Sequence, residues 1–300
     1  MDMHNKVFMK KILIFLLFSN SFSSVLFAQE DDMTKMLDEE TLLEKPKKEF
    51  ITAAFKGTRL INFHTLETLG KRTLDFRISH RFGDFNSGAN NAFGLDGPAC
   101  IRLGLEYSFE GRFMFGIGRT SYEKKLDGFM KFRLLRQTTN NSMPLSVTLV
   151  SSMFYTTVKA QPKYGYDVNR LSYAHQIIIG RKFSERFSFQ MAPIMVHYNI
   201  VDSVEDMNDM FGIQFASRLK YTKRSAITLE HAVRTSKYTN VKYYDSAAIG
   251  IEIETGGHVF QMQLTNSFGL VEDQFIPHTS SNWLNGGIKL GFNISRVFRV

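Results

Sequence analysis

The sequence predicts an all-β protein, a closed antiparallel up-and-down transmembrane β-barrel of about twelve strands. Three observations predict this fold. Apolar and polar side chains alternate over segments of nine or more residues, as in Leu74–Phe82, which reads LDFRISHRF. Short and long connections alternate along the chain. The composition, with 28 Phe and 11 Tyr against one Trp, is rich in residue types that favour strands.

The first 28 residues predict a secretory signal. Three lysines precede a short apolar run at 12–18, a Ser-rich stretch follows, and Leu26-Phe27-Ala28 offers a cleavage site. A membrane anchor would need about 20 consecutive apolar residues, which is longer than this run. We therefore expect export and cleavage after Ala28.

Two further segments precede the barrel, which we expect at 72–300. Residues 29–49 are charged and predict a periplasmic tail. Residues 50–71 have three placements open to them: a plug in the lumen, a run along the periplasmic rim, or an extra strand. A thirteenth spanning strand would make the strand count odd and leave the two ends of the chain on opposite sides of the membrane. It therefore conflicts with an even strand count.

Charge and cysteine content exclude several classes of protein. Without residues 1–28, which hold three Lys and one Asp, 34 basic and 28 acidic residues remain. The basic residues are scattered singly along strands, so no nucleic-acid patch is expected. Cys100 is the single cysteine, and an internal disulfide is therefore excluded.

Twelve alternating segments supply the expected strands. Soluble strands average about 5–6 residues, whereas tilted membrane-spanning strands need about 9–11, and most of these segments reach the larger figure. Their apolar positions run over Leu74–Phe82, Ile101–Phe109, Phe113–Ile117, Met130–Leu134, Leu145–Met153, Leu171–Ile179, Phe187–Pro193, Phe211–Tyr221, Ile227–Val233, Ile249–Ile253, Phe260–Leu264 and Ile288–Ile294.

The connections alternate in length, as in outer-membrane barrels with short periplasmic turns and long extracellular loops. Tight turns are expected at 110–111, 184–185, 222–223 and 255–257, with a middling one at 137–144. Long loops are expected at 83–99, 119–128, 158–170, 199–210, 235–242 and 268–284. Twelve strands return both ends to the periplasm. This predicts a bacterial outer-membrane location, with outer-membrane lipid as the first partner.

The apolar face of each strand is predicted to face lipid. A twelve-stranded barrel is wider than the eight-stranded kind that side chains just fill, so an apolar interior would be very large. A register slip of one residue would put Arg77 and Arg81 into hydrocarbon, at about 2–4 kcal/mol each near the midplane.

Short stretches along the chain resemble a family of membrane-bound β-barrels from Gram-negative bacteria (domain of unknown function 5777). The resemblance spans roughly residues 50–298 and implies an outer-membrane barrel without implying a cargo. The stretches are FKGTR (55–59), HRFG (80–83), FGLD (93–96), LGLEY (103–107), GIGR (116–119), DGFMK (127–131), GGHVFQ (256–261), TNS (265–267) and GFNISR (291–296).

The end of the last strand departs from the usual outer-membrane pattern. Such strands commonly close on an aromatic residue, which the outer-membrane assembly machinery reads, and we expect that machinery as a partner. Here Phe298 is followed by Arg299 and Val300. Arg296 falls on the lipid-facing parity, from which its long side chain can reach the headgroups.

Inward parity assigns charged residues to the lumen, with Asp75 beside the candidate pore-lining set. One interpretation is a channel or binding barrel for a small polar or anionic solute. The alternative is a closed lumen filled by ion pairs, in a structural or partner-docking barrel whose loops expose Phe275, Ile276 and Trp283. The candidate pore-lining residues are Arg77, Arg81, Arg102, Glu106, Lys131, Arg133, Glu230, Arg234, Glu252, Glu254 and Lys289.

Enzymatic chemistry has weaker support in the sequence. Five histidines lie on the apolar parity, and a lipid hydrolase could use one beside a serine on the outer wall, but no spacing singles out a Ser–His set. No paired Cys or His spacing indicates zinc. We therefore expect no catalytic residue, metal or cofactor. The histidines are His80, His175, His197, His231 and His258.

Overall fold

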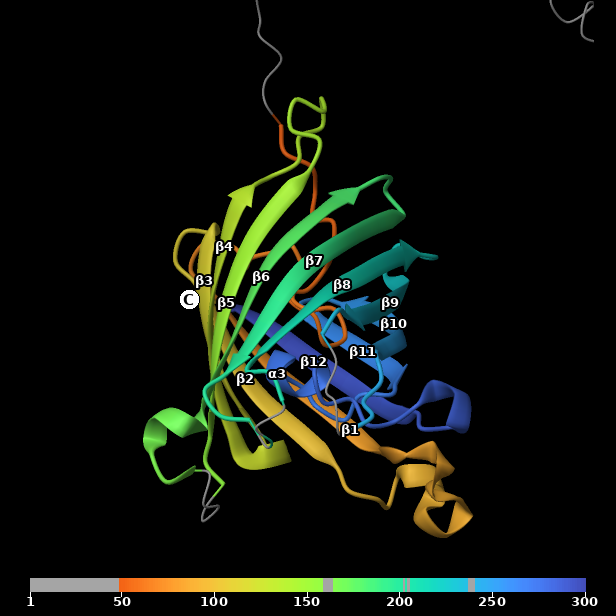
Figure 1. The fold of residues 1–300 in the computed structure, drawn as a ribbon. Helices are drawn as coiled ribbons and strands as arrows, with labels where there is room; N and C mark the ends of the chain where they lie inside the picture. The colour runs from red at the N-terminus through yellow and green to blue at the C-terminus, as the bar shows by residue number, and fades with distance from the viewer. Residues whose placement is uncertain (1–48, 159–163, 202, 204–205, 237–240) are drawn as a thin grey trace, which may run out of the picture. The chain divides into compact units, whose positions relative to one another are not determined.

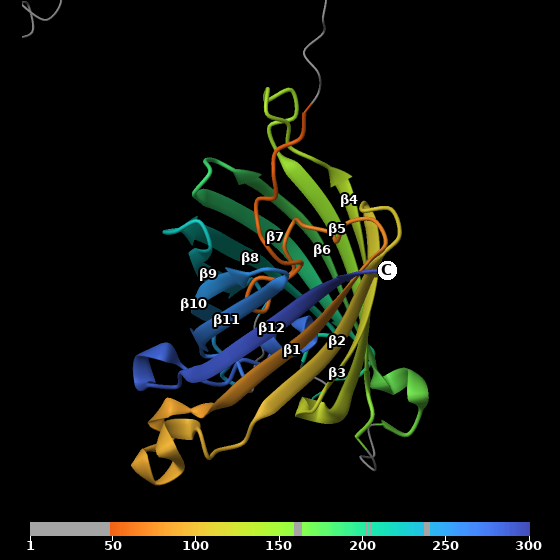
Figure 2. The same cartoon turned by 180° about the vertical axis from the view of Figure 1, so that it is seen from behind.

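Twelve antiparallel strands form the wall of a barrel, and the sheet closes because β1 pairs with β12 as well as with β2. Figures 1 and 2 show the closed barrel from opposite sides. The predicted fold class and strand number are confirmed. The computed structural model describes residues 49–300 except 159–163, 202, 204–205 and 237–240. The expected signal, and all but the last residue of the expected tail, lie outside the described residues.

The strands are eight to twelve residues long, and each coincides with a predicted segment to within one residue at the ends where the segment extends beyond the strand. They are β1 (Thr73–Asp84), β2 (Cys100–Ser108), β3 (Phe113–Thr120), β4 (Lys125–Leu135), β5 (Ser146–Thr156), β6 (Leu171–Lys182), β7 (Phe187–Tyr198), β8 (Asp209–Lys220), β9 (Ser225–Arg234), β10 (Ser246–Thr255), β11 (His258–Thr265) and β12 (Lys289–Arg299).

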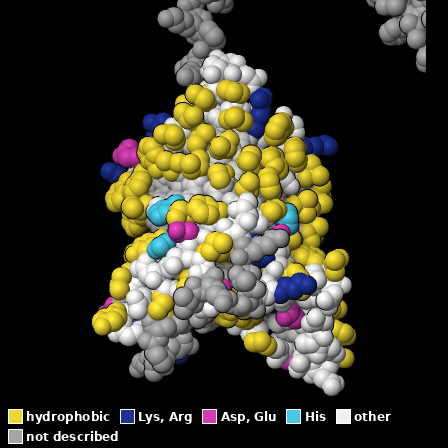
Figure 3. Space-filling view, in the orientation of Figure 1, with side chains coloured by type: hydrophobic (Ala, Val, Ile, Leu, Met, Phe, Trp, Pro, Cys, Tyr) yellow, Lys and Arg dark blue, Asp and Glu magenta, His cyan; other side chains and the backbone are white. Residues whose placement is uncertain are grey.

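Each strand has an apolar outer face. The inner face is largely polar, but in β5–β8 it is mixed, with buried apolar residues such as Val150, Ile178 and Ile194. In β10, Ile251 is 48% exposed while its neighbour Glu252 is 0% exposed. The same alternation of exposed and buried residues runs along the other strands. Apolar side chains accordingly cover much of the outer wall on the side shown in Figure 3. This arrangement suits a wall with hydrocarbon outside.

The connections divide the barrel into two ends. The tight turns and the 136–145 connection lie at one end, which we call the turn end, together with Arg72 and Val300, joined by a backbone hydrogen bond. The longer connections lie at the other, the loop end. One predicted loop is wrong: 119–128 shrinks to 121–124, because Arg119 of β3 pairs with Leu126 of β4.

Short helical turns occupy the loop-end connections. None of the described helices has the length and apolar character needed to cross a membrane. The helical turns are η1 (Phe85–Ser87), η2 (Ala89–Gly94), η3 (Tyr122–Lys124), η5 (Asp167–Arg170), α3 (Glu272–Phe275) and η6 (Trp283–Asn285).

Residues 50–70, hereafter the plug, run from the turn end into the lumen, where they appear as the orange trace inside the barrel in Figure 2. The plug begins with a β-bridge between Phe50 and Thr138 at the rim. Deeper inside, Thr65 donates its backbone N–H to Thr58, and Leu60 donates to Phe63. These two bonds fold 58–65 into a small hairpin. The structure places the hairpin residues inside the barrel, with Phe63 and His64 both 0% exposed.

A charge on the outer face should destabilise the barrel. We expect Ile251→Arg to lower the free energy of unfolding in lipid vesicles by about 2–4 kcal/mol, the cost of Arg near the membrane midplane. Chemical denaturation followed by fluorescence of Trp283, the single tryptophan, measures it. Val168→Arg, at a 57% exposed loop position, is the control and should change stability little. Equal losses in the two variants would contradict a lipid-facing outer wall.

Candidate functional site

The eleven candidate pore-lining residues all belong to the inner face of the wall. Arg81, Glu106, Lys131 and Glu252 are 0% exposed. Arg133 and Glu254, nearer the turn end, keep side-chain exposures of 13% and 18%. In this structure these side chains contact the plug, other residues of the wall or the loop-end connections, so their role in lining an open pore stays a prediction.

Glu230 of β9 holds the tip of the plug hairpin. Its carboxylate accepts the backbone N–H groups of Ile61, Asn62 and Phe63 at 2.7–3.0 Å. Nearby on β7, Gln190 accepts from the N–H of Leu66 at 3.1 Å and donates to the carbonyl of His64 at 2.7 Å. Two wall side chains thus satisfy backbone groups that the hairpin leaves unpaired.

The opposite side of the hairpin meets basic and amide side chains. Arg81 donates to the Asn62 side chain at 2.8 Å, and Lys131 donates to the Thr58 carbonyl at 3.0 Å. Asn293 donates to the Ile61 carbonyl at 2.9 Å. Strands β1, β4, β9 and β12 therefore all bind the same hairpin through polar contacts.

A second segment closes the lumen from the loop end. The β11–β12 connection (266–288), hereafter the inward loop, folds into the lumen. Its helix α3 is buried, and Phe275 stacks on Phe63 of the plug with 5.5 Å between ring centroids. The expectation that Phe275 and Ile276 are exposed is wrong, since they are 0% and 1% exposed. Both belong to the apolar cluster between the plug and the wall. Trp283 is partly exposed.

The inward loop brings two carboxylates into the lumen. Glu272 lies 3.1 Å from Arg59 Nη1 and 3.2 Å from His64 Nε2. Asp273 Oδ2 lies 2.5 Å from Lys125 Nζ. Sequence reasoning missed Arg59, His64, Glu272 and Asp273 as lumen residues because none of them lies on an alternating strand.

Burial, with help from Arg59 and Lys131, lowers the pKa of His64 in the plug well below its usual value, so this ring stays neutral.

The inner wall is positively charged. In the twelve strands, nine buried cations outnumber five buried acids. The cations are Arg77, Arg81, Arg102, Lys125, Lys131, Lys182, Arg218, Arg234 and Lys289. The acids are Asp75, Glu106, Asp127, Glu230 and Glu252.

Some polar groups of the wall are left without partners. Among the described residues, neither side-chain polar atom of Gln176 or Gln214 has a hydrogen bond, and the same is true of Arg77 Nε. Buried polar groups are normally paired. The wall therefore carries polar groups that neither the plug nor the inward loop pairs.

One Ser–His pair forms on the outer wall. Ser151 Oγ of β5 lies 3.0 Å from His175 Nδ1 of β6, its cross-strand neighbour. Ser151 is the middle residue of an eleven-residue strand, which places the pair far from the membrane boundary, where lipid esters lie. A hydrogen bond that satisfies two polar groups in hydrocarbon explains this pair.

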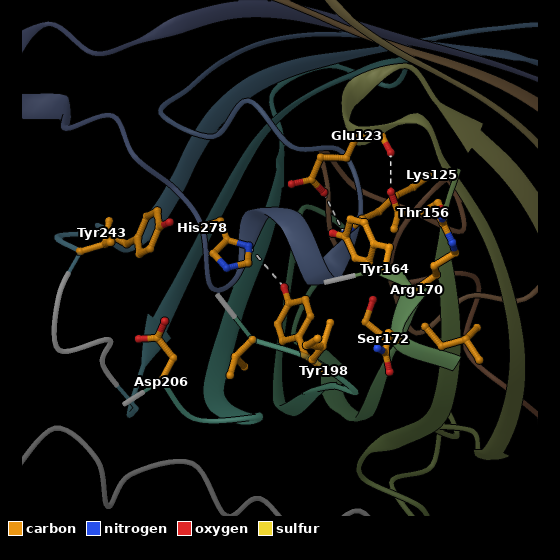
Figure 4. A pocket seen from close by; sticks show the side chains of 15 residues that line it. Glu123, Lys125, Thr156, Tyr164, Arg170, Ser172, Tyr198, Asp206, Tyr243 and His278 are labelled. Carbon is orange, nitrogen blue, oxygen red and sulfur yellow. Dashed lines mark hydrogen bonds and ion pairs between the residues drawn. The ribbon is translucent and has the colours of Figure 1, made fainter. Parts of the chain in front are cut away.

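A cavity of about 100 Å³ opens at the loop end above the inward loop. Figure 4 shows its lining, in which Tyr198 and His278 face each other. Lys125 and Ser172 also line it and are buried. Tyr198 Oη lies 3.3 Å from His278 Nδ1. This cavity, hereafter the vestibule, is the approach to the lumen from the loop end.

An apolar outer wall and a polar, filled interior define a membrane β-barrel. The sequence matches the model of the family described as membrane bound beta barrel domain (DUF5777) over residues 55–298, and the chain belongs to this family. No curated protein matches the sequence.

Several solved outer-membrane barrels are similar in fold. KdgM porin has 8% identity, covers 76% of this chain and 99% of its own, and gives a TM-score of 0.46. Outer membrane phospholipase A from Escherichia coli has 11% identity, with coverages of 76% and 91% and a TM-score of 0.42. OmpF of Salmonella typhi, in a complex with daunomycin, has 7% identity, with coverages of 75% and 97% and a TM-score of 0.37.

Loss of the Glu230 carboxylate should loosen the plug. We expect Glu230→Ala to leave the N–H groups of 61–63 unpaired, at about 1–3 kcal/mol for each buried donor. Hydrogen exchange at these amides should then accelerate roughly tenfold or more, since 1.4 kcal/mol is a factor of ten. Glu110→Ala, which changes an exposed turn residue, should leave their exchange unchanged. Unchanged exchange in Glu230→Ala would show that this carboxylate does not hold the plug.

Proposed function

We propose that the protein is a non-enzymatic outer-membrane channel for small anionic or polar solutes, closed in this structure by the plug and the inward loop. The observation that carries the proposal is the polar attachment of the plug. Its hairpin is held by Glu230, Gln190, Arg81 and Asn293 through hydrogen bonds. Water or a solute can replace such bonds when the plug moves.

The polarity of the wall supports a lumen that opens to water. A permanently closed core gains little from buried charges, because replacing a buried ion pair by apolar side chains is often neutral or stabilising. A wall that is hydrated in one of its states has to be polar. The unpaired amides of Gln176 and Gln214 fit this requirement. The excess of wall cations favours anions as the solute.

The rival proposal is a closed structural barrel, and specific ion pairs favour it. Arg102 binds Asp127 with two hydrogen bonds, at 3.0 and 2.5 Å. Arg218 binds Glu252 and Glu254 at 2.7 and 2.6 Å. Each of these pairs, however, joins two residues of the wall, so none of them requires the plug as a partner.

The topology supports an orientation with the turn end in the periplasm and the loop end outside. The segment that reads as a secretory signal, residues 1–28, would deliver the chain for insertion. The plug would then be reached from the periplasm and the vestibule from outside.

Removing the plug should open the lumen. We expect the full chain in planar bilayers to stay closed for long periods. A variant lacking 50–69 should give discrete channels, because the inward loop then loses its contacts with Arg59 and Phe63 and its hold on the lumen weakens. A second variant, Glu230→Ala with Asn293→Ala, keeps the plug but removes two of its anchors and should open intermittently. Single-channel recording measures both, with Glu110→Ala as the control. A silent deletion variant that keeps its barrel circular dichroism would favour the closed structural barrel.

The open lumen should prefer anions. We expect Arg102→Gln with Arg133→Gln, made in the variant lacking 50–69, to shift the reversal potential in a KCl gradient towards cation preference. The lost cations face the lumen, whereas Arg186→Gln changes an exposed turn residue and should leave selectivity as it was. Unchanged selectivity in the double variant would mean that the conducting path avoids these residues.

A further inference from the structure

The inward loop is a source of negative charge in a positively charged lumen. Glu272 and Asp273 are adjacent in α3, and both are 0% exposed. Since the strands carry more buried cations than acids, these two carboxylates reduce an imbalance that the wall leaves. The loop therefore acts as a tethered anion.

Asp273 occupies a site built by three strands. Lys125 of β4 lies 2.5 Å from Oδ2 and also 2.9 Å from Glu123 Oε2, and Ser172 of β6 donates to the same Asp273 oxygen at 2.6 Å. Tyr198 of β7 donates its hydroxyl to the backbone carbonyl of Asp273. A cation and two hydroxyl donors converging on one acidic residue have the composition of an anion-binding site.

The loop carboxylates fill this region incompletely. Among the described residues, Asp273 Oδ1 and Glu272 Oε2 have no hydrogen-bond partner, although an ionised carboxylate has about four acceptor positions. Burial also raises the pKa of Asp273 above its usual value, in spite of Lys125 and Ser172. Burial therefore disfavours the ionised form of Asp273 more than Lys125 and Ser172 favour it.

The same donors are accessible from the loop end. Lys125, Ser172 and Tyr198 all line the vestibule, as Figure 4 shows. The lining also holds one further cation, Arg170, and two acids, Glu123 and Asp206. A solute that enters from outside would meet these groups before it reached the plug.

We propose that Lys125, Ser172 and Tyr198 form a binding site for a small anion bearing a carboxylate or phosphate group, and that Asp273 occupies the site until such an anion displaces it. The inference rests on the proposed function for the direction from which the solute enters. It adds the chemical class of the solute and names Asp273 as the group that controls its first binding step. Because Asp273 is tethered, it competes at an effective concentration of roughly millimolar order. Phosphate at lower concentration binds weakly until Asp273 is removed.

Trp283 provides a readout of this displacement. It lies in the same β11–β12 connection as α3, and its indole N–H donates to the Ala247 carbonyl at 3.3 Å. Outward movement of the loop disturbs this contact and changes the fluorescence of the single tryptophan. The signal does not depend on whether the plug leaves or whether ions pass.

The experiment titrates the full chain, in an uncharged phosphate-free detergent, with inorganic phosphate at constant ionic strength set by chloride. The expected result is a saturable fluorescence change. The phosphate concentration that gives half of the maximal change should be at least about tenfold lower for Asp273→Asn than for the unaltered chain. Lys125→Met combined with Asp273→Asn removes the cation without leaving a lone buried carboxylate, and should not respond. Ser172→Ala should weaken binding, and Lys124→Met, at the exposed neighbouring lysine, should not.

Three outcomes would overturn the inference. They are the same response in the Lys125→Met double variant, an unchanged half-maximal phosphate concentration in Asp273→Asn, or no response to phosphate in any variant. A parallel arm adds phosphatidylglycerol to the micelles in place of phosphate, and a response confined to that arm would assign the site to lipid headgroups and overturn the soluble anion. A saturable phosphate response in a chain whose plug-deleted form never conducts would refute the channel and leave the binding site standing.

Discussion

The structure depends on one constraint: a closed wall with hydrocarbon outside turns its polar side chains inward, where each buried charge needs a partner. Fourteen buried charged residues of the strands face the lumen. Some pair within the wall, as Arg102 does with Asp127. Others bind the plug or the inward loop, as Glu230 and Lys125 do. The filling of the lumen is therefore a consequence of the wall's polarity, and the same polarity allows water to take the place of the filling.

The alternation of side chains made the wall predictable. Because the side-chain period of a strand is two, a run such as Leu74–Phe82 determines which face meets lipid, and twelve such runs determine the barrel. The boundaries were harder where glycine interrupts the pattern. Gly128 stands on the outer face of β4 opposite Ile117, and the missing apolar side chain there made the start of that strand read as a loop.

The contents of the lumen were not predictable in the same way. The hairpin at 58–65 and α3 have no period-two pattern, because their side chains meet different strands in several directions. Glu272 and Asp273 read as ordinary acids of a long loop, and Phe275 as an exposed apolar residue. A signal was nevertheless present in VEDQFI (271–276), where apolar residues flank two acids. Such a segment gains by burying its apolar residues where cations can meet its acids, but the sequence alone does not show which cations those are.

The plug and the inward loop stabilise each other, and this determines how the lumen can open. Arg59 of the plug binds Glu272 of the loop at 3.1 Å, and Phe63 stacks on Phe275. If the loop left alone, Arg59 would lose this partner and Phe63 would lose its stacking contact. Breaking a buried ion pair by removing one partner costs about 3–5 kcal/mol, unless water reaches the charge that remains. When either segment leaves the lumen, water enters from that end of the barrel and reaches the remaining charge of the pair. The other segment is then held less strongly in the lumen. In the proposed channel, opening from the loop end and opening from the turn end would therefore be coupled through the Arg59–Glu272 contact, although the two segments enter the lumen from opposite ends.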